Sequence, residues 1–332
     1  MIVAEISANH LGDIDRALAL VESAAWAGAD AVKIQTYRPD SITIDYDGDE
    51  FIIDAGPWKG MKLYDLYQQA ATPLSWHARI FERAKDLGIL CFSSPFSIED
   101  VDFLQQFDPP YYKIASFEIT DVNLIAAAAA TGKPIIISTG MADFDDINDA
   151  VTAAHFAEDI TLLHCVSMYP TPTEFSDLNR MIWIKNQFGK KIGLSDHSLS
   201  IEVPVAAIAI GATVIEKHLT LSRSDGGPDA SFSLEPWEFK KLVEAVKEIK
   251  TSMSFEIESM PRLKGNSDPH FNLRRSLYVV KDIAKGEKFS NENVRSIRPG
   301  YGLPPKYLGA VLGKYAAVEI QRGTPMSMEF VQ

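Results

Sequence analysis

The chain has 332 residues, and its 45 acidic and 32 basic side chains give a formal net charge of −13 at pH 7. This negative charge, with lysines and arginines scattered along the chain, argues against nucleic acid or an anionic membrane as the main partner, although a locally basic site can still bind a small anion. The N-terminus lacks the basic and apolar segments of a signal peptide, and no apolar run is long enough to span a bilayer.

Short apolar strands alternate with amphipathic helices from the first residue onward. Asp13 begins a helix whose apolar residues recur at helical spacing up to Gly28, and strand-like runs at 2–7 and 31–36 flank it. The same alternation predicts further strands at 89–94, 112–116, 134–139, 160–167, 191–195 and 213–221. It predicts further helices at 76–87, 98–107, 121–131, 143–157, 178–188 and 237–250, and the alanine-rich segment between the last two strands also suits a helix.

Eight strand–helix units in about 255 residues fit a (β/α)8 barrel, the TIM-barrel architecture. A doubly wound open sheet is the structural alternative, although eight such units would be many for one sheet. No glycine fingerprint follows the first strand, so a dinucleotide-binding fold is not supported.

Two regions interrupt the alternation. Residues 37–71 carry several glycines and prolines and are expected to be irregular, and a loop of that length after a strand is usually functional or a lid. After a barrel domain of residues 1–255, the polar stretch 256–272 favours a linker. Residues 273–332 hold short strands, glycine turns and almost no helical period, which predicts a small β-rich domain with a thin core that would gain stability by docking on a neighbour.

The seventh and eighth predicted strands each end in a histidine near an acid, Asp196-His197 and Glu216-Lys217-His218. A strand–helix–strand unit makes the two strands parallel and brings their carboxyl ends to one face, where both imidazoles can share one divalent metal. Because no cysteine cluster accompanies them, Mn²⁺ or Mg²⁺ is favoured over structural Zn²⁺. The alternative is a hydrogen-bonded pair of structural histidines. His164, inside a strand, is expected in the core or in a supporting position.

Hydroxyl groups gather where the predicted strands end, and in a barrel of this type the working residues occupy those ends. Five consecutive strands, the third to the seventh, end in serines: Ser94, Ser116, Ser138, Ser167 and Ser195. With Lys113 they form a plausible cradle for a phosphate or carboxylate group. The alternative is that serines are simply common at strand ends.

Lys33 and Lys113 lie inside strand-like runs that are otherwise apolar. A buried lysine must pair with an acid or bind an anion, because an unpaired buried charge is costly. Such a lysine suits a Schiff-base aldolase or a phosphate site, and the histidine pair favours the phosphate site. Cys91 and Cys165 also lie in apolar runs and are expected to be buried free thiols, which fits a reducing cytosol.

Motifs along nearly the whole chain resemble the sialic acid synthase family of phosphoenolpyruvate-dependent nonulosonate synthases. They are AEISANH, DAVKIQTY, CFSSPF, YKIASFEIT, KPIIISTGMA, LLHCVSMYPTP, GLSDHSL, VIEKHLTL and GGPDASFSLEP, followed by a tail similar to the antifreeze-like (SAF) domain of these enzymes. ISANH, IQTY, SFEIT and GGPDASFSLEP are most similar to the pseudaminic acid branch. One departure is Leu11 before Gly12, where the family usually has Asn-Gly after Asn-His.

The resemblance implies a TIM barrel with a small C-terminal SAF domain. It implies condensation of phosphoenolpyruvate with the open-chain aldehyde of an acetamido sugar, with release of phosphate by C–O cleavage. For the pseudaminic branch the acceptor is 2,4-diacetamido-2,4,6-trideoxy-altrose. The resemblance further implies a homodimer in which the SAF domain crosses over the partner barrel, so that Arg298 binds an acetamido oxygen and Phe271 lines the site.

The resemblance also implies roles for residues of the barrel. His197 and His218 bind the Mn²⁺ or Mg²⁺, and Glu118 acts as a base toward water. Phosphoenolpyruvate is held by Lys113, Ser94, Ser116, Ser138, Ser167 and Ser195. The sugar is faced by Glu5, Lys33, Tyr169, Glu216 and Asp229.

Other interpretations of the same residues stay open. Within the class, the chain can be an N-acetylneuraminate or N,N'-diacetyllegionaminate synthase. Outside it, a metal-dependent aldolase that uses pyruvate would release no phosphate and would not need the serines. A non-catalytic sugar- or ice-binding module, suggested by the tail alone, does not explain two histidines and two lysines at strand ends.

Overall fold

The chain forms two compact units, residues 1–254 and residues 255–332, and each has a hydrophobic core of its own. The computed structural model describes residues 1–254 and 271–332. The predicted linker, residues 256–272, therefore lies almost wholly outside the described residues.

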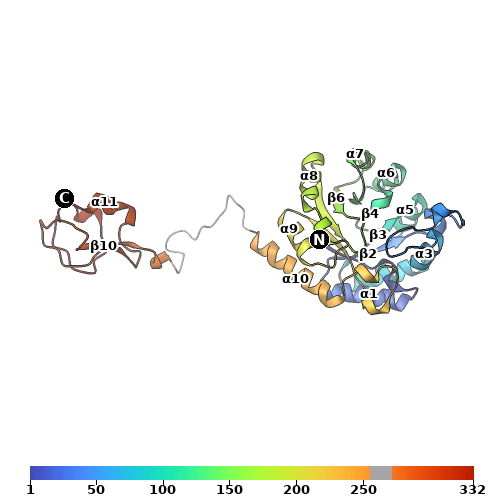
Figure 1. The fold of residues 1–332 in the computed structure, drawn as a ribbon, viewed down its shortest axis with the longest axis horizontal. Coiled ribbons are helices and arrows are strands. Elements are labelled where there is room, and N and C mark those ends of the chain that lie inside the picture. The colour runs from blue at the N-terminus through green and yellow to red at the C-terminus, as the bar shows by residue number, and fades with distance from the viewer. Residues whose placement is uncertain (255–270) are drawn as a thin grey trace. The chain divides into compact units, whose positions relative to one another are not determined.

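The first unit is a closed barrel of eight parallel strands, in which each strand pairs with the next along the chain and β8 pairs with β1 (Figure 1). The strands are β1 (Ile2–Glu5), β2 (Ala31–Thr36), β3 (Leu90–Pro95), β4 (Tyr112–Ile114), β5 (Ile135–Ser138), β6 (Ile160–Cys165), β7 (Lys191–Asp196) and β8 (Val214–His218). Closure confirms the predicted (β/α)8 barrel and excludes the open doubly wound sheet, which would leave two strand edges unpaired.

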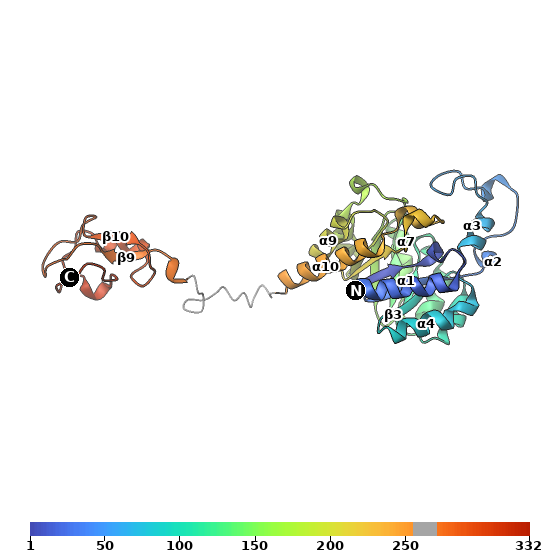
Figure 2. The same ribbon diagram turned by 90° about the horizontal axis from the view of Figure 1, so that it is seen from below.

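Helices cover the outside of the barrel, and Figure 2 shows α10 lying alongside α1. They are α1 (Ile14–Ala27), α4 (His77–Asp86), α5 (Ile98–Gln105), α6 (Val122–Ala130), α7 (Phe144–Ala153), α8 (Leu178–Phe188), α9 (Glu202–Ala209) and α10 (Pro236–Ser252). The predicted ends of α1 are confirmed: the Asp13 side chain accepts from the backbone N–H of Asp15 at 2.8 Å, and Gly28 stops the helix at φ +84°. No helix in the described ranges is both long and apolar enough to cross a membrane.

The barrel interior is layered, because the side chains of a strand alternate between its two faces. Its floor is a buried apolar cluster of Val3, Ala31, Phe92, Ile136, Leu163 and Val214. Two positions further along the same six strands stand polar residues: Glu5, Lys33, Ser94, Ser138, Cys165 and Glu216. In β7 the floor position is Gly193, where an added Cβ would lie 2.3 Å from the carbonyl oxygen of Val214. The polar layer therefore rests on a close-packed apolar floor.

Residues 37–71, expected to be irregular, contain α2 (Pro39–Ile42) and α3 (Leu63–Ala70). The expectation was wrong for residues 63–70, where Leu63, Leu66, Tyr67 and Ala70 repeat at helical spacing and Leu66 is buried. The helix is short and follows a stretch rich in glycine, so its period was not apparent beside those turn signals.

The second unit is small and poor in helix, as predicted. β9 (Ser276–Val279) pairs antiparallel with β10 (Val294–Ile297), and α11 (Leu308–Val311) is a single short turn of helix. Gly286 and Gly323 occupy the predicted turns with φ of +84° and +89°, a conformation that glycine adopts without strain. Its core consists of a single cluster of buried residues: Leu277, Val279, Ile283, Phe289, Val294, Val311, Ala316, Ile320 and Met326.

Candidate active site

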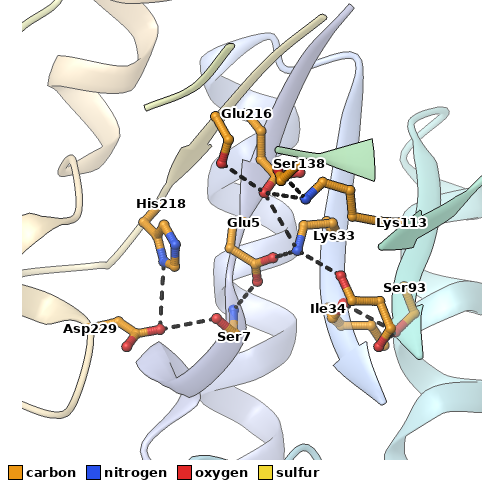
Figure 3. Close-up of polar contacts among 12 residues, drawn as sticks. Glu5, Ser7, Lys33, Ile34, Ser93, Lys113, Ser138, Glu216, His218 and Asp229 are labelled. Carbon is orange, nitrogen blue, oxygen red and sulfur yellow. Dashed lines mark hydrogen bonds and ion pairs between the residues drawn. The ribbon is translucent and has the colours of Figure 1, made fainter. Parts of the chain in front are cut away.

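Four charged side chains meet inside the barrel, directly above its apolar floor (Figure 3). The Nζ of Lys33 on β2 forms an ion pair with Glu5 on β1 and lies 3.6 Å from Oε1 of Glu216 on β8. The Nζ of Lys113 on β4 lies 3.7 Å from the same Glu216 oxygen. None of the four side chains is more than 6% exposed, so their charges stabilise one another instead of being solvated.

The sharing of Glu216 between two lysines sets the pKa values of this group. Burial opposes ionisation of Glu216, but the charges of Lys113 and Lys33 outweigh it and lower the pKa of the carboxyl. Burial also opposes the charge of Lys33, yet Glu216 and Glu5 raise its pKa. For Lys113 burial prevails, helped by repulsion from Lys33, and the pKa is lowered in spite of Glu216. Lys113 is therefore the least compensated cation of the four and a natural partner for a bound anion.

One of the predicted serines contacts Lys113, and two others contact each other. Ser138 Oγ accepts a hydrogen bond from the Lys113 Nζ at 2.7 Å. The hydroxyls of Ser116 and Ser167 lie 3.2 Å apart, and an added Cβ at Gly140 would lie 2.5 Å from the Ser116 Cβ. The backbone at Gly140 thus approaches these hydroxyls as closely as a residue without a side chain permits.

The other two predicted serines contact the charged groups on the β1 and β8 side. Ser94 Oγ accepts from the Lys33 Nζ at 3.1 Å, and Ser195 Oγ donates to Glu216 Oε1 at 3.5 Å. Ser138, Ser94 and Ser195 therefore contact the buried charge cluster, and Ser138 does so at Lys113. Ser116 and Ser167 contact each other, and the part of all five in holding an anion remains a prediction.

Glu118 follows β4 in the short 3-10 helix Ser116–Glu118. Its Oε2 is buried and has no hydrogen-bond partner within the described part of the chain. Burial raises the pKa of this carboxyl to about 7, because the nearby Lys113 only partly offsets the loss of hydration. Near neutral pH the group can therefore take up or give off a proton, as the predicted general base must.

The two predicted metal ligands lie side by side at the carboxyl ends of β7 and β8, with ring centroids 5.4 Å apart. The His197 Nδ1 donates to the carbonyl oxygen of Val166 at 3.0 Å, which leaves its Nε2 as the acceptor. The buried Nδ1 of His218 has no hydrogen-bond partner among residues 1–254 and 271–332, and the Asp229 carboxylate lies 3.5 Å from it. The side chain of Asp229 also accepts from Ser7 Oγ at 3.0 Å.

This arrangement fits a divalent cation. Two imidazoles next to a carboxylate, one with an unpaired buried nitrogen, are the donors that such an ion uses. The described residues include no group of three or more His, Cys, Asp or Glu side chains arranged to hold an ion. His197 and His218 would thus leave coordination positions open to water and substrate oxygens, as a catalytic metal needs.

Aromatic rings cover the histidine pair. Tyr169, in the loop after β6, has its ring centroid 4.4 Å from that of His197, and the Phe232 centroid lies 4.9 Å from that of His218. Tyr169 and Phe232 are themselves 5.0 Å apart, so they form a continuous aromatic surface. Tyr169 was predicted on the sugar side, whereas Phe232 was not singled out, although it lies in the GGPDASFSLEP motif.

Cys165 was predicted only as a buried free thiol, and it is one, but its place is inside the site. Its sulfur lies 3.9 Å from both the His197 Nδ1 and the Ser167 hydroxyl. Burial favours the neutral thiol, yet the neighbouring His197 and Lys113 lower its pKa. Its position in the polar layer, two residues after Leu163 in β6, was the signal that could have placed it there.

Other groups at the strand ends support the structure instead. His164 Nε2 lies 2.9 Å from the carbonyl oxygen of Ser176, in agreement with the supporting position expected for it. Asp196, which precedes His197, accepts from the buried Lys217 Nζ at 2.5 Å. This pair fixes the ends of β7 and β8 to each other.

Two predicted site residues belong to the second unit. Arg298 lies directly after β10, and Phe271 begins the short 3-10 helix Phe271–Leu273. Their predicted roles concern the partner chain of a homodimer and remain predictions.

Known proteins resemble the chain over most of its length. The NeuB family model matches residues 20–258, and the SAF domain model matches residues 274–331. A pseudaminic acid synthase of Campylobacter jejuni serotype O:2 is 46% identical over 97% of this chain and 94% of that protein. An N,N'-diacetyllegionaminic acid synthase from the same organism is 35% identical over 95% of each chain. The crystal structure of an N-acetylneuraminic acid synthetase from Leptospira borgpetersenii in complex with citrate has a TM-score of 0.70 at 32% identity, covering 78% of this chain and 87% of that one.

The raised pKa of Glu118 predicts a pH-dependent stability that Glu118→Gln should remove. Between its ordinary pKa of 4.5 and the folded value of about 7, the folded protein keeps a proton that the unfolded chain has lost. This carboxyl should therefore lower the free energy of unfolding by roughly 2–3 kcal/mol as the pH rises through this window. Buried histidines such as His77, whose pKa is lowered to about 4, contribute in the opposite direction. Urea unfolding at pH 5, 6, 7 and 8 therefore isolates Glu118 as the difference between the wild type and Glu118→Gln. That difference should change across the pH series, whereas the exposed control Glu244→Gln should follow the wild type; equal pH dependence in all three proteins would contradict the assignment.

Proposed function

The chain belongs to the NeuB family, and on that premise we propose that it condenses phosphoenolpyruvate, 2,4-diacetamido-2,4,6-trideoxy-L-altrose and water into pseudaminic acid and inorganic phosphate. The observation that carries the reaction is the pair of buried lysines that share Glu216 beside the two histidines. The choice of sugar is supported by the 46% identity to a pseudaminic acid synthase, against 35% to a legionaminic acid synthase of the same organism.

The Lys113 end of the charge cluster suits phosphoenolpyruvate. This substrate carries a carboxylate and a phosphate, and Lys113 is the cation whose lowered pKa shows incomplete compensation. Ser138 accepts a hydrogen bond from its amine, and the hydroxyls of Ser116 and Ser167 lie next to each other. In this proposal these groups, with Ser94 and Ser195, hold the two anionic groups and offset the repulsion from an acidic protein.

The open end of the cluster suits the sugar. Glu5, Lys33 and Glu216 line it from β1, β2 and β8, while Asp229 and Tyr169 lie beside the histidines. His197 and His218 would hold the Mn²⁺ or Mg²⁺. When bound, such an ion supplies Lewis-acid polarisation of the aldehyde, which phosphoenolpyruvate needs because its C3 is a weak nucleophile.

The residues of the chain then divide the remaining chemistry. Holding C3 of phosphoenolpyruvate against the aldehyde carbon lets the C–C bond form with little loss of motional entropy. Positive charge that develops at C2 lies near the buried carboxylates, which are already oriented by the lysines. Glu118 takes a proton from the water that adds at C2, and the oxygen of the former aldehyde takes up a proton to become a hydroxyl. The C2–O bond to phosphate then breaks, the new C2 hydroxyl gives up its proton as the ketone forms, and phosphate leaves with its bridging oxygen.

The second unit would complete the site of a partner chain. In this proposal the chain is a homodimer, the SAF domain crosses to the other barrel, Arg298 binds an acetamido oxygen there and Phe271 lines the same site. A row of large exposed apolar side chains on the loops after β4 to β7 supports a covering partner: Phe117, Met141, Met168 and Leu199 are each more than 40% exposed. Patches of this kind are seldom left open to water.

Phosphate release with different sugars tests the proposed reaction. The purified protein with phosphoenolpyruvate and Mn²⁺ should release phosphate with the altrose-configured diacetamido sugar, the acceptor expected of a protein 46% identical to a pseudaminic acid synthase. Chelation should stop release, and added Mn²⁺ or Mg²⁺ should restore it. Turnover only with N-acetylmannosamine or the legionaminic precursor would overturn the sugar assignment. Consumption of pyruvate without phosphate would favour the aldolase.

Mixing two inactive variants tests the swapped homodimer. Arg298→Ala should lack the cap and His197→Ala should lack a metal ligand, so each alone should be nearly inactive. After both are unfolded together and refolded, random pairing should give mixed dimers with one intact site in two, and about a quarter of wild-type activity. Recovery no greater than the sum of the separate variants would mean that Arg298 serves its own barrel or none.

A further inference from the structure

Trp58 is the least exposed residue of an otherwise exposed loop tip, residues 54–60. Residues 54–57 and 59–60 are exposed, whereas the Trp58 side chain is only partly accessible. The tip is held internally by the bridge between Ile52 and Lys62 and by hydrogen bonds of 2.9 Å from Ile53 N to Met61 O and 2.7 Å from Gly60 N to Ile53 O. The tip therefore presents its indole as part of an internally bonded segment.

The indole of Trp58 reaches the active-site rim at two places. Its Nε1 donates to the carbonyl oxygen of Pro228 at 2.9 Å, across 170 residues of sequence. Its ring centroid lies 5.3 Å from that of Tyr169 and 6.2 Å from that of Phe232. Since these two rings cover the histidine pair, Trp58 extends the aromatic surface one layer outward.

The segment that Trp58 contacts is the one that carries Asp229. This segment is also held from its other side. Leu11 packs against Gly227, where an added Cβ would lie 2.3 Å from the leucine Cδ2, and Arg16 forms an ion pair with Asp225 at 2.8 Å. Leu11 has a backbone φ of +52°, in the left-handed region, and replaces the asparagine that the family usually has before Gly12. The facing loop has a glycine, Gly227, at the point where the Leu11 side chain packs.

The order of these groups places Trp58 on the acceptor side. Lys113, Ser138 and the carboxylates lie together in the polar layer next to the apolar floor. His197 and His218 lie at the ends of β7 and β8, Tyr169 and Phe232 pack against them, and Trp58 packs against those two rings. In the proposed function, phosphoenolpyruvate is the smaller substrate and is bound at Lys113. The sugar must extend outward from the histidines, toward the aromatic surface.

We propose that Trp58 forms the outer wall of the acceptor site and determines specificity for the apolar substituents of the sugar. This inference rests on the proposed function. A sugar with two acetamido methyl groups and a 6-methyl in place of a hydroxyl offers aromatic rings far more apolar surface than a fully hydroxylated hexose. The N–H of Trp58 meanwhile fixes Pro228 and hence Asp229 next to His218. Removal of the indole thus weakens the sugar site and leaves the deep anion site intact.

Steady-state kinetics on the full chain tests this wall. Trp58→Ala should raise KM for the diacetamido sugar by about tenfold or more and leave KM for phosphoenolpyruvate within about twofold. Trp58→Phe keeps a ring in the same place and should recover most of the loss. Trp237→Ala is the matched control, because Trp237 is 65% exposed and packs edge-on against Trp26 on the outside of the barrel. Thermal unfolding of each variant shows that the fold persists.

The possible outcomes distinguish failure of this proposal from failure of the proposed function on which it rests. If the wild-type protein turns over no diacetamido sugar, the proposed function is wrong. If the wild type is active and Trp58→Ala leaves KM for the sugar unchanged, the wall is wrong. The proposed wall is also wrong if the KM values for sugar and phosphoenolpyruvate rise together, or if Trp58→Phe has a KM for the sugar as high as that of Trp58→Ala. Those results are expected if Trp58 only anchors the loop.

Discussion

The sharing of one buried carboxylate by two buried lysines is the interaction on which the rest of the site depends. Glu216 compensates Lys33 together with Glu5, and this leaves Lys113 short of negative charge. A buried cation in that state is costly unless an anion completes it. The free protein thus has a buried cation above the barrel floor that lacks a full partner charge, and in the proposed function phosphoenolpyruvate supplies that charge. An acidic protein can bind a ligand with two anionic groups in this way, because the local charge balance of the site decides binding.

The barrel makes such a cluster possible by separating its layers. The apolar floor excludes water from below, and closure of the sheet leaves access only from the carboxyl ends of the strands. Above the charges, the histidines, the aromatic surface and the tip that carries Trp58 follow in turn. In the proposed complex, the charged layer therefore faces the phosphate, the histidines face the aldehyde, and the aromatic wall faces the apolar substituents of the sugar.

Sequence reasoning could bring the candidate residues together because strand period and strand ends are local properties. It placed Glu5, Lys33 and Glu216 at the barrel mouth and paired His197 with His218, and these side chains do lie together, while their roles remain predictions. It could not foresee that Ser94 and Ser195 bind the Lys33–Glu216 side, since which side chains face one another depends on barrel closure. The role of Trp58 could not be predicted for the same reason, because no neighbouring sequence feature indicates its hydrogen bond to Pro228. The helix at 63–70 was missed because surrounding turn residues hid its short period.

Binding of phosphoenolpyruvate in the absence of sugar tests the central claim most directly. Calorimetric titration of the metal-loaded wild type should show binding, and Lys113→Met should weaken it by about a hundredfold or more while thermal unfolding shows an intact fold. The exposed Lys191, which pairs with Asp159 on the barrel exterior, provides the control variant Lys191→Met with unchanged affinity. If Lys113→Met folds and binds phosphoenolpyruvate as tightly as the wild type, the uncompensated lysine is not what the substrate meets, and the account fails.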